Sequence, residues 1–432
     1  MNRRSFLTTA GTGMVGTGLA SLLVPRWAQA QPPSDQIVTG HIGVGGMGGG
    51  HVRWFLGHKD VRVVAVCDVD EQRAAEKLKW VHGKYSATEA KAYRDFRQVL
   101  DRKDIDAIST ATPDHWRAMI VTHAFMAGKD VYAEKPLCHN YREARTMLEM
   151  SRRYNRVFQL GTQIHAGDNY HRVVELVRSG ALGKLHTLRV WSNGGAGVIN
   201  RSAGAKPPAN FDYDFWLGPA PWRPYDPGHT HFRFRYFLDY SCGHYADFWC
   251  HISDIAFWAA DITETPRTVQ SRGELQSQGI ADAPRWIDVD LEFPNGLKYF
   301  WTTRPPQIPH AKGKGMAALF QGTEGSLVCD YGSRTLFLGN EELRDLDYVP
   351  KSVPRSRGHQ RNFLDCVKTR QLTESNLPYV VNMTTPMFFG RIGLLCGGRK
   401  LTWDAEKEEF TGDPEATRLL GRVYREPWAL PV

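Results

Sequence analysis

The feature that most constrains the fold is a regular alternation of short apolar runs and amphipathic segments between residues 37 and 161. Residues 37–44, 61–66, 105–111 and 130–133 are strand candidates, and residues 71–80, 94–102, 115–127 and 141–154 carry apolar side chains at helical spacing. Apolar strands separated by amphipathic helices indicate a parallel sheet covered on both faces. Residues 157–161 are expected to add the sixth strand. The pattern predicts an N-terminal, doubly wound α/β domain over residues 36–160.

The pattern changes after this segment. A helix around residues 170–179, strand-like stretches at 185–191 and 287–293, and longer loops predict an α+β domain over residues 161–432. Its sheet is expected to be open and mostly antiparallel. The segment 194–227, rich in Gly, Pro, Asn and Trp, is too long for a simple connection. We expect it to be a binding loop or an arm that packs on a partner subunit.

The composition excludes several classes of protein. With 432 residues, 42% hydrophobic and 23% charged, the chain is neither intrinsically disordered nor a small disulfide scaffold. The net charge of +8 includes three arginines near the N-terminus, and the remaining excess is too diffuse to predict binding to nucleic acid. The seven cysteines show no metal-ligand spacing and no disulfide framework, so most are expected to be buried small residues.

The N-terminal 30 residues look like a targeting segment. Arg3 and Arg4 precede a weakly apolar run over residues 8–24, and Ala28 and Ala30 offer small residues for a signal peptidase. We interpret residues 1–30 as a twin-arginine (Tat) signal peptide cleaved after Ala30, which predicts a periplasmic or otherwise exported protein. The run is short and glycine-rich, so no integral membrane segment is expected. An uncleaved amphipathic N-terminus or a lipid-surface anchor is the open alternative.

A glycine motif follows the first predicted strand. Gly43, Gly45 and Gly48 form G-x-G-x-x-G, with Gly46 and Met47 between them, at the start of a predicted helix. Such a turn brings the backbone close to a pyrophosphate, and the helix N-terminus favours the anion. Asp68 ends the next strand about 20 residues later, where a carboxylate accepts hydrogen bonds from ribose hydroxyls. A carboxylate there repels a 2′-phosphate, so NAD is predicted and NADP is less favoured. Asp70 is a possible second contact.

Two further motifs follow predicted parallel strands, at the sheet edge where α/β proteins bind ligands. Thr112 and Pro113 come after residues 105–111, and Glu134-Lys135-Pro136 comes after residues 130–133. The ammonium of Lys135 can polarise a substrate hydroxyl. A surface lysine in a turn before proline is the open alternative.

A polar stripe lies further along the chain. His244, Asp247, His251 and Asp254 stand three, four and three residues apart, which places them on one face of a helix. Such a face suits a metal site or a proton-transfer site. Nothing nearby supplies a further ligand set, so we predict no metal. Capping or a buried polar network is the structural alternative, and it fits Asp254 best.

Together these residues resemble the Gfo/Idh/MocA oxidoreductases, named after glucose-fructose oxidoreductase and inositol dehydrogenase. The resemblance covers essentially the whole chain after the signal segment, including Gly161-Thr162-Gln163 and the loop over residues 216–240. It implies a Rossmann domain that binds NAD, followed by a substrate and oligomerisation domain with an open sheet, in a homo-oligomer that is a dimer or a tetramer. Carried over, Lys135, Asp247 and His251 line the substrate pocket beside the nicotinamide.

The resemblance also implies a reaction. Hydride would pass between a carbinol carbon of a sugar and the nicotinamide, with His251 as general base assisted by Lys135. Asp247 would orient His251 or hold a neighbouring hydroxyl, and which of His251 and Lys135 takes the proton stays open. Further expected cofactor contacts are His115, Glu134 and Gln163, and further expected substrate contacts are His165, Tyr170, Arg235, Tyr236 and His244.

The sequence therefore predicts an exported NAD-dependent oxidoreductase that acts on a sugar or glycoside hydroxyl and keeps its cofactor tightly bound. One alternative is the family's glycosidase branch, in which transient oxidation permits elimination. The intact Glu134-Lys135-Pro136 departs from that branch. A catalytically inactive carbohydrate-binding protein and a metal-dependent hydrolase using His244, Asp247 and His251 are further alternatives.

Overall fold

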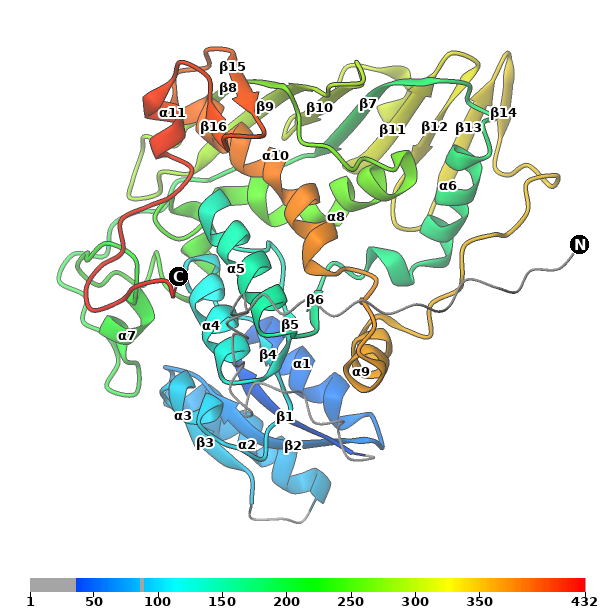
Figure 1. Ribbon diagram of the computed structural model, residues 1–432. Coiled ribbons are helices and arrows are strands. Elements are labelled where there is room, and N and C mark those ends of the chain that lie inside the picture. Colours follow the sequence, from blue (N-terminus) through cyan, green and yellow to red (C-terminus); the bar gives the residue numbers. More distant parts are fainter. Residues whose placement is uncertain (1–35, 86–88, 432) are drawn as a thin grey trace, which may run out of the picture.

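The computed structural model describes residues 36–85 and 89–431. The segment interpreted as a signal peptide lies outside these residues. Figure 1 shows two sheets, one near each end of the molecule in this view, with several helices lying between them.

The N-terminal sheet has six parallel strands in the order β3-β2-β1-β4-β5-β6. The predicted doubly wound α/β fold is confirmed. One strand, β3, was not predicted, because it has three residues and all are at least partly exposed. The strands are β1 (Ile37–Ile42), β2 (Val61–Cys67), β3 (Lys91–Tyr93), β4 (Ala107–Thr110), β5 (Asp130–Ala133) and β6 (Phe158–Leu160).

Helices cover both faces of this sheet. The first two, α1 (Gly46–Leu56) and α2 (Glu71–Tyr85), share an apolar cluster with α9 (His359–Thr369), which comes from the far end of the chain. Arg361 and Lys368 of α9 bind Asp60 at 2.8 and 2.7 Å. The structure thus places residues 359–369, which lie in the expected second domain, against the first sheet. The other face is covered by α3 (Phe96–Leu100), α4 (Asp114–Met126) and α5 (Tyr141–Arg153).

The second sheet has ten strands in the order β14-β13-β12-β11-β7-β10-β9-β8-β15-β16. Its hydrogen-bonded neighbours are antiparallel except β7 and β10, so the predicted open, mostly antiparallel sheet is confirmed. The strands are β7 (Leu185–Ser192), β8 (Thr268–Leu275), β9 (Pro284–Glu292), β10 (Lys298–Thr302), β11 (Met316–Gly322), β12 (Gly325–Cys329), β13 (Arg334–Leu338), β14 (Glu341–Leu343), β15 (Leu401–Asp404) and β16 (Glu409–Phe410).

The helices α6 (Asp168–Arg178), α8 (Gly243–Ala260) and α10 (Leu377–Leu395) cover the face of this sheet that is turned toward the N-terminal domain (Figure 1). Two buried indoles fix α8: Trp249 donates to the carbonyl of Met383 at 2.9 Å, and Trp301 donates to Ser253 at 3.0 Å. Because α8 is held against the sheet and against α10, its polar stripe has a fixed direction. The remaining short elements are η2 (Ile164–Ala166), α7 (Tyr213–Leu217), η3 (His231–Tyr236), η4 (Pro309–Ala311) and α11 (Pro414–Arg418).

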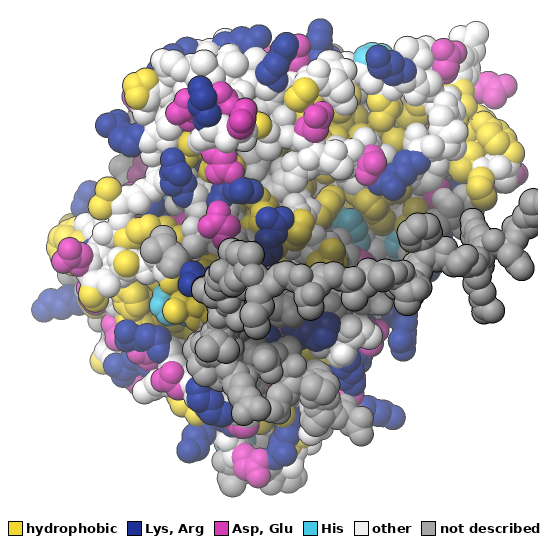
Figure 2. Space-filling view, viewed as in Figure 1, with side chains coloured by type: hydrophobic (Ala, Val, Ile, Leu, Met, Phe, Trp, Pro, Cys, Tyr) yellow, Lys and Arg dark blue, Asp and Glu magenta, His cyan; other side chains and the backbone are white. Residues whose placement is uncertain are grey.

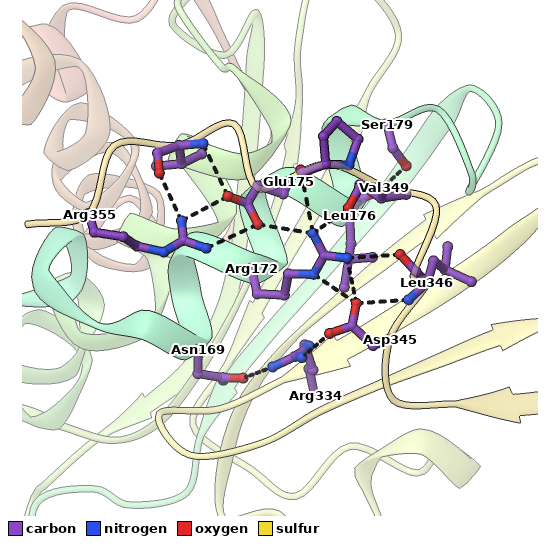
Figure 3. A network of polar contacts seen from close by, with 12 residues as sticks. Asn169, Arg172, Glu175, Leu176, Ser179, Arg334, Asp345, Leu346, Val349 and Arg355 are labelled. Carbon is purple, nitrogen blue, oxygen red and sulfur yellow. Dashed lines mark hydrogen bonds and ion pairs between the residues drawn. The ribbon is translucent and has the colours of Figure 1, made fainter.

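A charged network ties α6 to the far end of the second sheet (Figure 3). Glu175 is fully buried and binds Arg172 at 3.1 Å and Arg355 at 2.8 Å. Arg172 also binds Asp345 at 2.7 Å, and Asp345 binds Arg334 of β13 at 2.5 Å. The network therefore connects α6, β13 and the segment that follows β14 as one unit.

The surface shown in Figure 2 carries basic and acidic side chains interspersed, without a large field of one sign. None of the helices in the described ranges has the length and apolar character that a bilayer-spanning segment requires. All seven cysteines fall within those ranges, and each is buried and unpaired.

Candidate functional site

A cavity of about 660 Å³ opens at the carboxyl ends of the parallel strands. The β1–α1 turn and the ends of β2, β4 and β5 line one side, and α7 and η3 from the second half of the chain line the other. Of the residues predicted to bind the cofactor, the cavity brings together Gly43, Gly45, Gly46, Met47, Asp68, Thr112, Pro113, Glu134 and Lys135.

The glycine turn has the geometry that a pyrophosphate site requires. Gly43 has a φ of +74°, which favours glycine, and it starts the turn after β1. A Cβ on Gly48 would lie 1.9 Å from the carbonyl oxygen of Gly43, so only glycine permits this close packing of α1 on the turn. Gly48 itself is not on the cavity wall. Around Gly46 a Cβ would meet nothing within 4 Å, which leaves backbone accessible at the N-terminus of α1.

The expected ribose contact, Asp68, lies on the cavity wall. The backbone N–H of Asp70 donates to its carboxylate at 3.0 Å. Burial raises the pKa of Asp68 to about 6, against the effect of this hydrogen bond and of Arg73. Arg73 and Arg94 also line the cavity here and were not predicted, because neither belongs to a motif. The glycine cradle and the carboxylate beside it fit a dinucleotide with free ribose hydroxyls.

A segment of the second half of the chain closes over this site. We call residues 210–235 the strap. The backbone of Asn210 accepts from Glu71 N–H at 2.9 Å, and its side-chain amide donates to Asp70 at 2.9 Å. Phe232 is 68% exposed at the mouth of the cavity. The strap also contributes the wall residues Phe215, Trp216, His231, Phe234 and Arg235.

The strap is braced from behind by the C-terminal tail. Arg425 donates to the carbonyl of Gly218 at 2.9 Å and binds Asp214 at 2.7 Å. The ring of Trp428 lies 4.7 Å from Trp116 of α4. The long loop was predicted to be a binding loop or an arm for a partner subunit, and in this structure the part within the strap packs on the N-terminal domain of its own chain.

Lys135, on the cavity wall, binds Asp247 of α8, which the cavity lining does not include. The Lys135 Nζ lies 2.7 Å from Asp247 Oδ1, and Arg235 Nε lies 3.1 Å from the same carboxylate. Burial opposes ionisation of Asp247, but the two cations outweigh it and lower its pKa to about 2. Behind Lys135, the buried Glu134 binds His51 at 3.0 Å. The cluster therefore holds a lysine ammonium in a fixed position.

His251 stands on the next turn of α8 and has a different partner. Its Nδ1 lies 2.7 Å from the hydroxyl of Tyr331, and no hydrogen bond joins it to Asp247 in the described structure. Burial, reinforced by the Lys135 ammonium, lowers the pKa of His251 to about 4. The imidazole is therefore neutral at pH 7. His244, two turns before His251, bonds to Ser192 Oγ at 3.0 Å.

Other predicted residues lie away from the cavity wall. The carboxylate of Asp254 is fully buried and binds His165 at 3.0 Å and the hydroxyl of Tyr379, which is the buried network that the sequence left open for Asp254. His115 is buried and bonds to the carbonyl of Trp216 at 3.1 Å, so it braces the strap. The cavity lining likewise excludes Tyr170, which is buried. It also excludes five partly exposed residues that were predicted to belong to the site: Gln163, Tyr236, His244, Asp247 and His251.

Sequence reasoning missed Tyr331. It lies in the turn between β12 and β13, and 80 residues separate it from His251. No motif marks it, so only the three-dimensional structure brings it to α8. Within the described residues, no group of three or more His, Cys, Asp or Glu side chains is placed to hold a metal ion.

Models of one protein family match both halves of the chain. Residues 37–162 match the model described as "Oxidoreductase family, NAD-binding Rossmann fold". Residues 172–430 match the "Oxidoreductase family, C-terminal alpha/beta domain" of the same family.

Curated relatives include a glycosyl hydrolase family 109 protein of Shewanella pealeana, 31% identical over 207 residues. One from Shewanella baltica is 25% identical over 203 residues. Each alignment covers 43% of this chain and 44% of the relative, so the match spans less than half of either protein.

Solved structures share the fold. The WlbA dehydrogenase from Chromobacterium violaceum, crystallised with NADH and UDP-GlcNAcA, has a TM-score of 0.65 at 13% identity and covers 87% of this chain and 99% of its own. GenD2 from gentamicin A biosynthesis, in complex with NAD, has a TM-score of 0.61 at 19% identity, over 89% of this chain and 100% of its own. An aldose-aldose oxidoreductase from Caulobacter crescentus has a TM-score of 0.62 at 15% identity, over 85% and 99%.

Because the two family models together cover nearly all of the described residues, the chain belongs to the Gfo/Idh/MocA oxidoreductase family, and its N-terminal domain is an NAD-binding Rossmann fold.

Proposed function

We propose that this protein is an NAD-dependent oxidoreductase that acts on a hydroxyl-bearing carbon of a sugar or glycoside and keeps its cofactor tightly bound. The observation that carries the proposal is the position of Lys135, which reaches the cofactor cavity and is held at 2.7 Å by Asp247 of α8. A cation fixed there favours a substrate alkoxide over the hydroxyl.

A bound NAD supplies the hydride acceptor for the carbinol carbon. Residues of the chain accept the hydroxyl proton and stabilise the charge left on the oxygen. His251 is neutral at pH 7, because burial lowers its pKa, and it can accept the hydroxyl proton. Lys135 stabilises the developing charge on the oxygen. Asp247, an ionised carboxylate, accepts a hydrogen bond from a neighbouring hydroxyl and keeps Lys135 in place.

Tight retention of the cofactor is supported by the strap. It is anchored to the start of α2 at Glu71 and Asp70 and braced by Arg425 of the tail. Release of a nucleotide from beneath it requires these contacts to open, which slows dissociation.

A second candidate is NAD-dependent glycoside cleavage, in which the sugar is oxidised only transiently. The glycosyl hydrolase family 109 relatives favour it. The sequence departs from that branch at Lys135, which stands in an intact Glu-Lys-Pro motif. The same residues would serve both reactions at the oxidation step, so an experiment must separate them by their products.

The first test is chemical analysis of the purified protein. It is denatured, and the released nucleotide is identified with its redox state and its ratio to protein. We expect stoichiometric NAD or NADH; absence of nucleotide, together with no binding of added NAD, would refute both candidates. Stoichiometric NADP would overturn the role of Asp68.

The second test uses p-nitrophenyl and methyl glycosides in deuterated water. Net oxidation gives nicotinamide fluorescence and a ketone in equal amounts. Cleavage gives p-nitrophenol without net change in redox state, and deuterium enters next to the transiently oxidised carbon. Lys135→Met and His251→Gln should each lower turnover at least about 100-fold with nucleotide content unchanged, whereas the exposed control Lys351→Met should not.

We further propose that the protein is exported, with residues 1–30 as a Tat signal. Cell fractionation and N-terminal sequencing test this proposal. The mature chain should begin at Gln31 outside the cytoplasm, and replacing Arg3 and Arg4 by lysine should block its export. A cytoplasmic protein that begins at Met1 would refute it.

A further inference from the structure

Within residues 36–85 and 89–431, His251 has no hydrogen-bonded acidic partner of the kind that commonly orients a catalytic imidazole. Four charged groups face it: Lys135 and Glu134 after β5, Arg235 of η3, and Asp247 one turn earlier on α8. Both carboxylates are already engaged, because Glu134 binds His51, and Asp247 binds Lys135 and Arg235. Among the described residues, the hydrogen-bond partner of His251 is the hydroxyl of Tyr331, at 2.7 Å from Nδ1.

This contact bears on which ring nitrogen carries the proton. A neutral imidazole has one N–H, and an N–H without an acceptor costs more in a largely buried position than a free lone pair. In the described structure the side chain of His251 has one acceptor within reach, the Tyr331 oxygen beside Nδ1. Tyr331 is 45% exposed, so its own O–H can donate to water. If the ring donates from Nδ1 to this oxygen, Nε2 keeps its lone pair.

Tyr331 is itself held by a rigid turn. Asp330 accepts from the backbone N–H of Gly332 at 3.0 Å and of Ser333 at 2.8 Å, and it binds Lys314 at 2.5 Å. Asn169 of α6 donates to the carbonyl of Asp330 at 2.9 Å.

The turn is also tied to the network of Figure 3. In that view Asn169 and Arg334 point toward each other, and Arg334 donates to Asn169 at 3.0 Å and to Asp345 at 2.5 Å. The ring of Tyr331 rests edge-on against buried Tyr170, with 5.4 Å between centroids. The network that joins α6, β13 and the segment after β14 thus fixes the position of the tyrosine hydroxyl.

We propose that Tyr331 is the positioning residue of the reaction: its hydroxyl accepts the Nδ1–H of His251, fixes the tautomer and leaves Nε2 free to take the substrate proton. The inference rests on the proposed function for its catalytic meaning. The tautomer itself is a property of the protein without substrate, so it is measured independently.

The test is nitrogen NMR of protein labelled with ¹⁵N-histidine, near pH 7, with the His251 signals assigned by their loss in His251→Gln. In the wild type we expect His251 to be protonated at Nδ1. In Tyr331→Phe, which keeps the ring against Tyr170, His251 should change to the Nε2-protonated form, which imidazole prefers in water. The exposed Tyr348→Phe is the matched control and should leave the signals unchanged. Nε2 protonation in the wild type, or an unchanged tautomer in Tyr331→Phe, would overturn the proposal.

If Tyr331→Phe does not keep the wild-type fold, a second variant still tests the proposal. Asp330→Asn retains the hydroxyl but weakens the turn that holds it, so a mixture of both tautomers is expected; an unmixed Nδ1-protonated signal contradicts the role of the turn.

With a glycoside that the wild type turns over, Tyr331→Phe should lower kcat about 10- to 100-fold with KM within about twofold. A changed tautomer with unchanged kcat would show that His251 is not the base, which is a failure of the proposed function and not of the tautomer assignment.

Discussion

Replacement of Asp247 by asparagine tests whether the pair with Lys135 is a net stabilising interaction. The side chain keeps its shape and loses its charge, so Lys135 and Arg235 lose their shared anion. In the folded protein the pKa of Asp247 is about 2, compared with the ordinary aspartate value of 3.8. A difference of this size corresponds to about 2 kcal/mol in favour of the folded state at pH 7.

The pH dependence of this contribution to stability follows from the direction in which the pKa of Asp247 is shifted. A carboxyl whose folded pKa is depressed stabilises the fold above its unfolded pKa and loses that contribution as pH falls through its folded pKa. The difference between wild type and Asp247→Asn should therefore be constant from pH 7 to pH 5. It should fall to about half near pH 3, because the wild-type carboxyl is then partly protonated in the unfolded chain.

Urea denaturation of both proteins at pH 7, 5 and 3 measures this difference, with the exposed Asp347→Asn as the control for loss of a surface carboxylate. Buried ion pairs are often near neutral overall, since desolvation offsets attraction. If Asp247→Asn is as stable as the wild type at pH 7, or if the difference does not shrink at low pH, the depressed pKa and the stabilising role of the pair are both refuted.

Three further substitutions test the cavity and its supports. Gly48→Ala should lower NAD affinity at least about 10-fold, because its Cβ meets the Gly43 carbonyl at 1.9 Å; a fluorescence titration that matches the wild type would contradict this. Arg425→Ala should speed NAD release about 10-fold by loosening the strap, and equal rates in a chase with unlabelled NAD would exclude the tail as a brace. Glu175→Gln leaves Arg172 and Arg355 without their buried anion and should lower the free energy of unfolding by about 3 kcal/mol. Urea denaturation measures this loss, and a loss under about 1 kcal/mol would argue against the network as a support.

The sequence predicts those parts of the site that depend on the spacing of residues along the chain. The glycine turn, Asp68 after the next strand and Lys135 after β5 all follow strands of one parallel sheet, so their common edge is predictable. The helical spacing of Asp247 and His251 likewise puts both on α8.

The partners of these residues were not predictable from spacing. Asp247 meets Lys135 across 112 residues, and His251 meets Tyr331 in a turn without a motif. The sequence left open whether Asp247 orients His251 or holds a hydroxyl. The structure joins Asp247 to Lys135 and Arg235, which lie 2.7 and 3.1 Å from its carboxylate. Other predicted site residues are buried and bond to groups inside the protein. His165 bonds to Asp254, and His115 bonds to the carbonyl of Trp216.

The position of α9 has a consequence for how this chain can be divided. A fragment that ends at residue 160 would contain every strand of the first sheet but would uncover the apolar surface around Phe55 and Tyr132, which Phe363 of α9 covers. Such a fragment is expected to aggregate, since exposed apolar patches of this kind associate. The nucleotide-binding half is thus not a transferable module. A chimera between two members of the family would have to exchange residues 359–369 together with the first domain to keep one intact core.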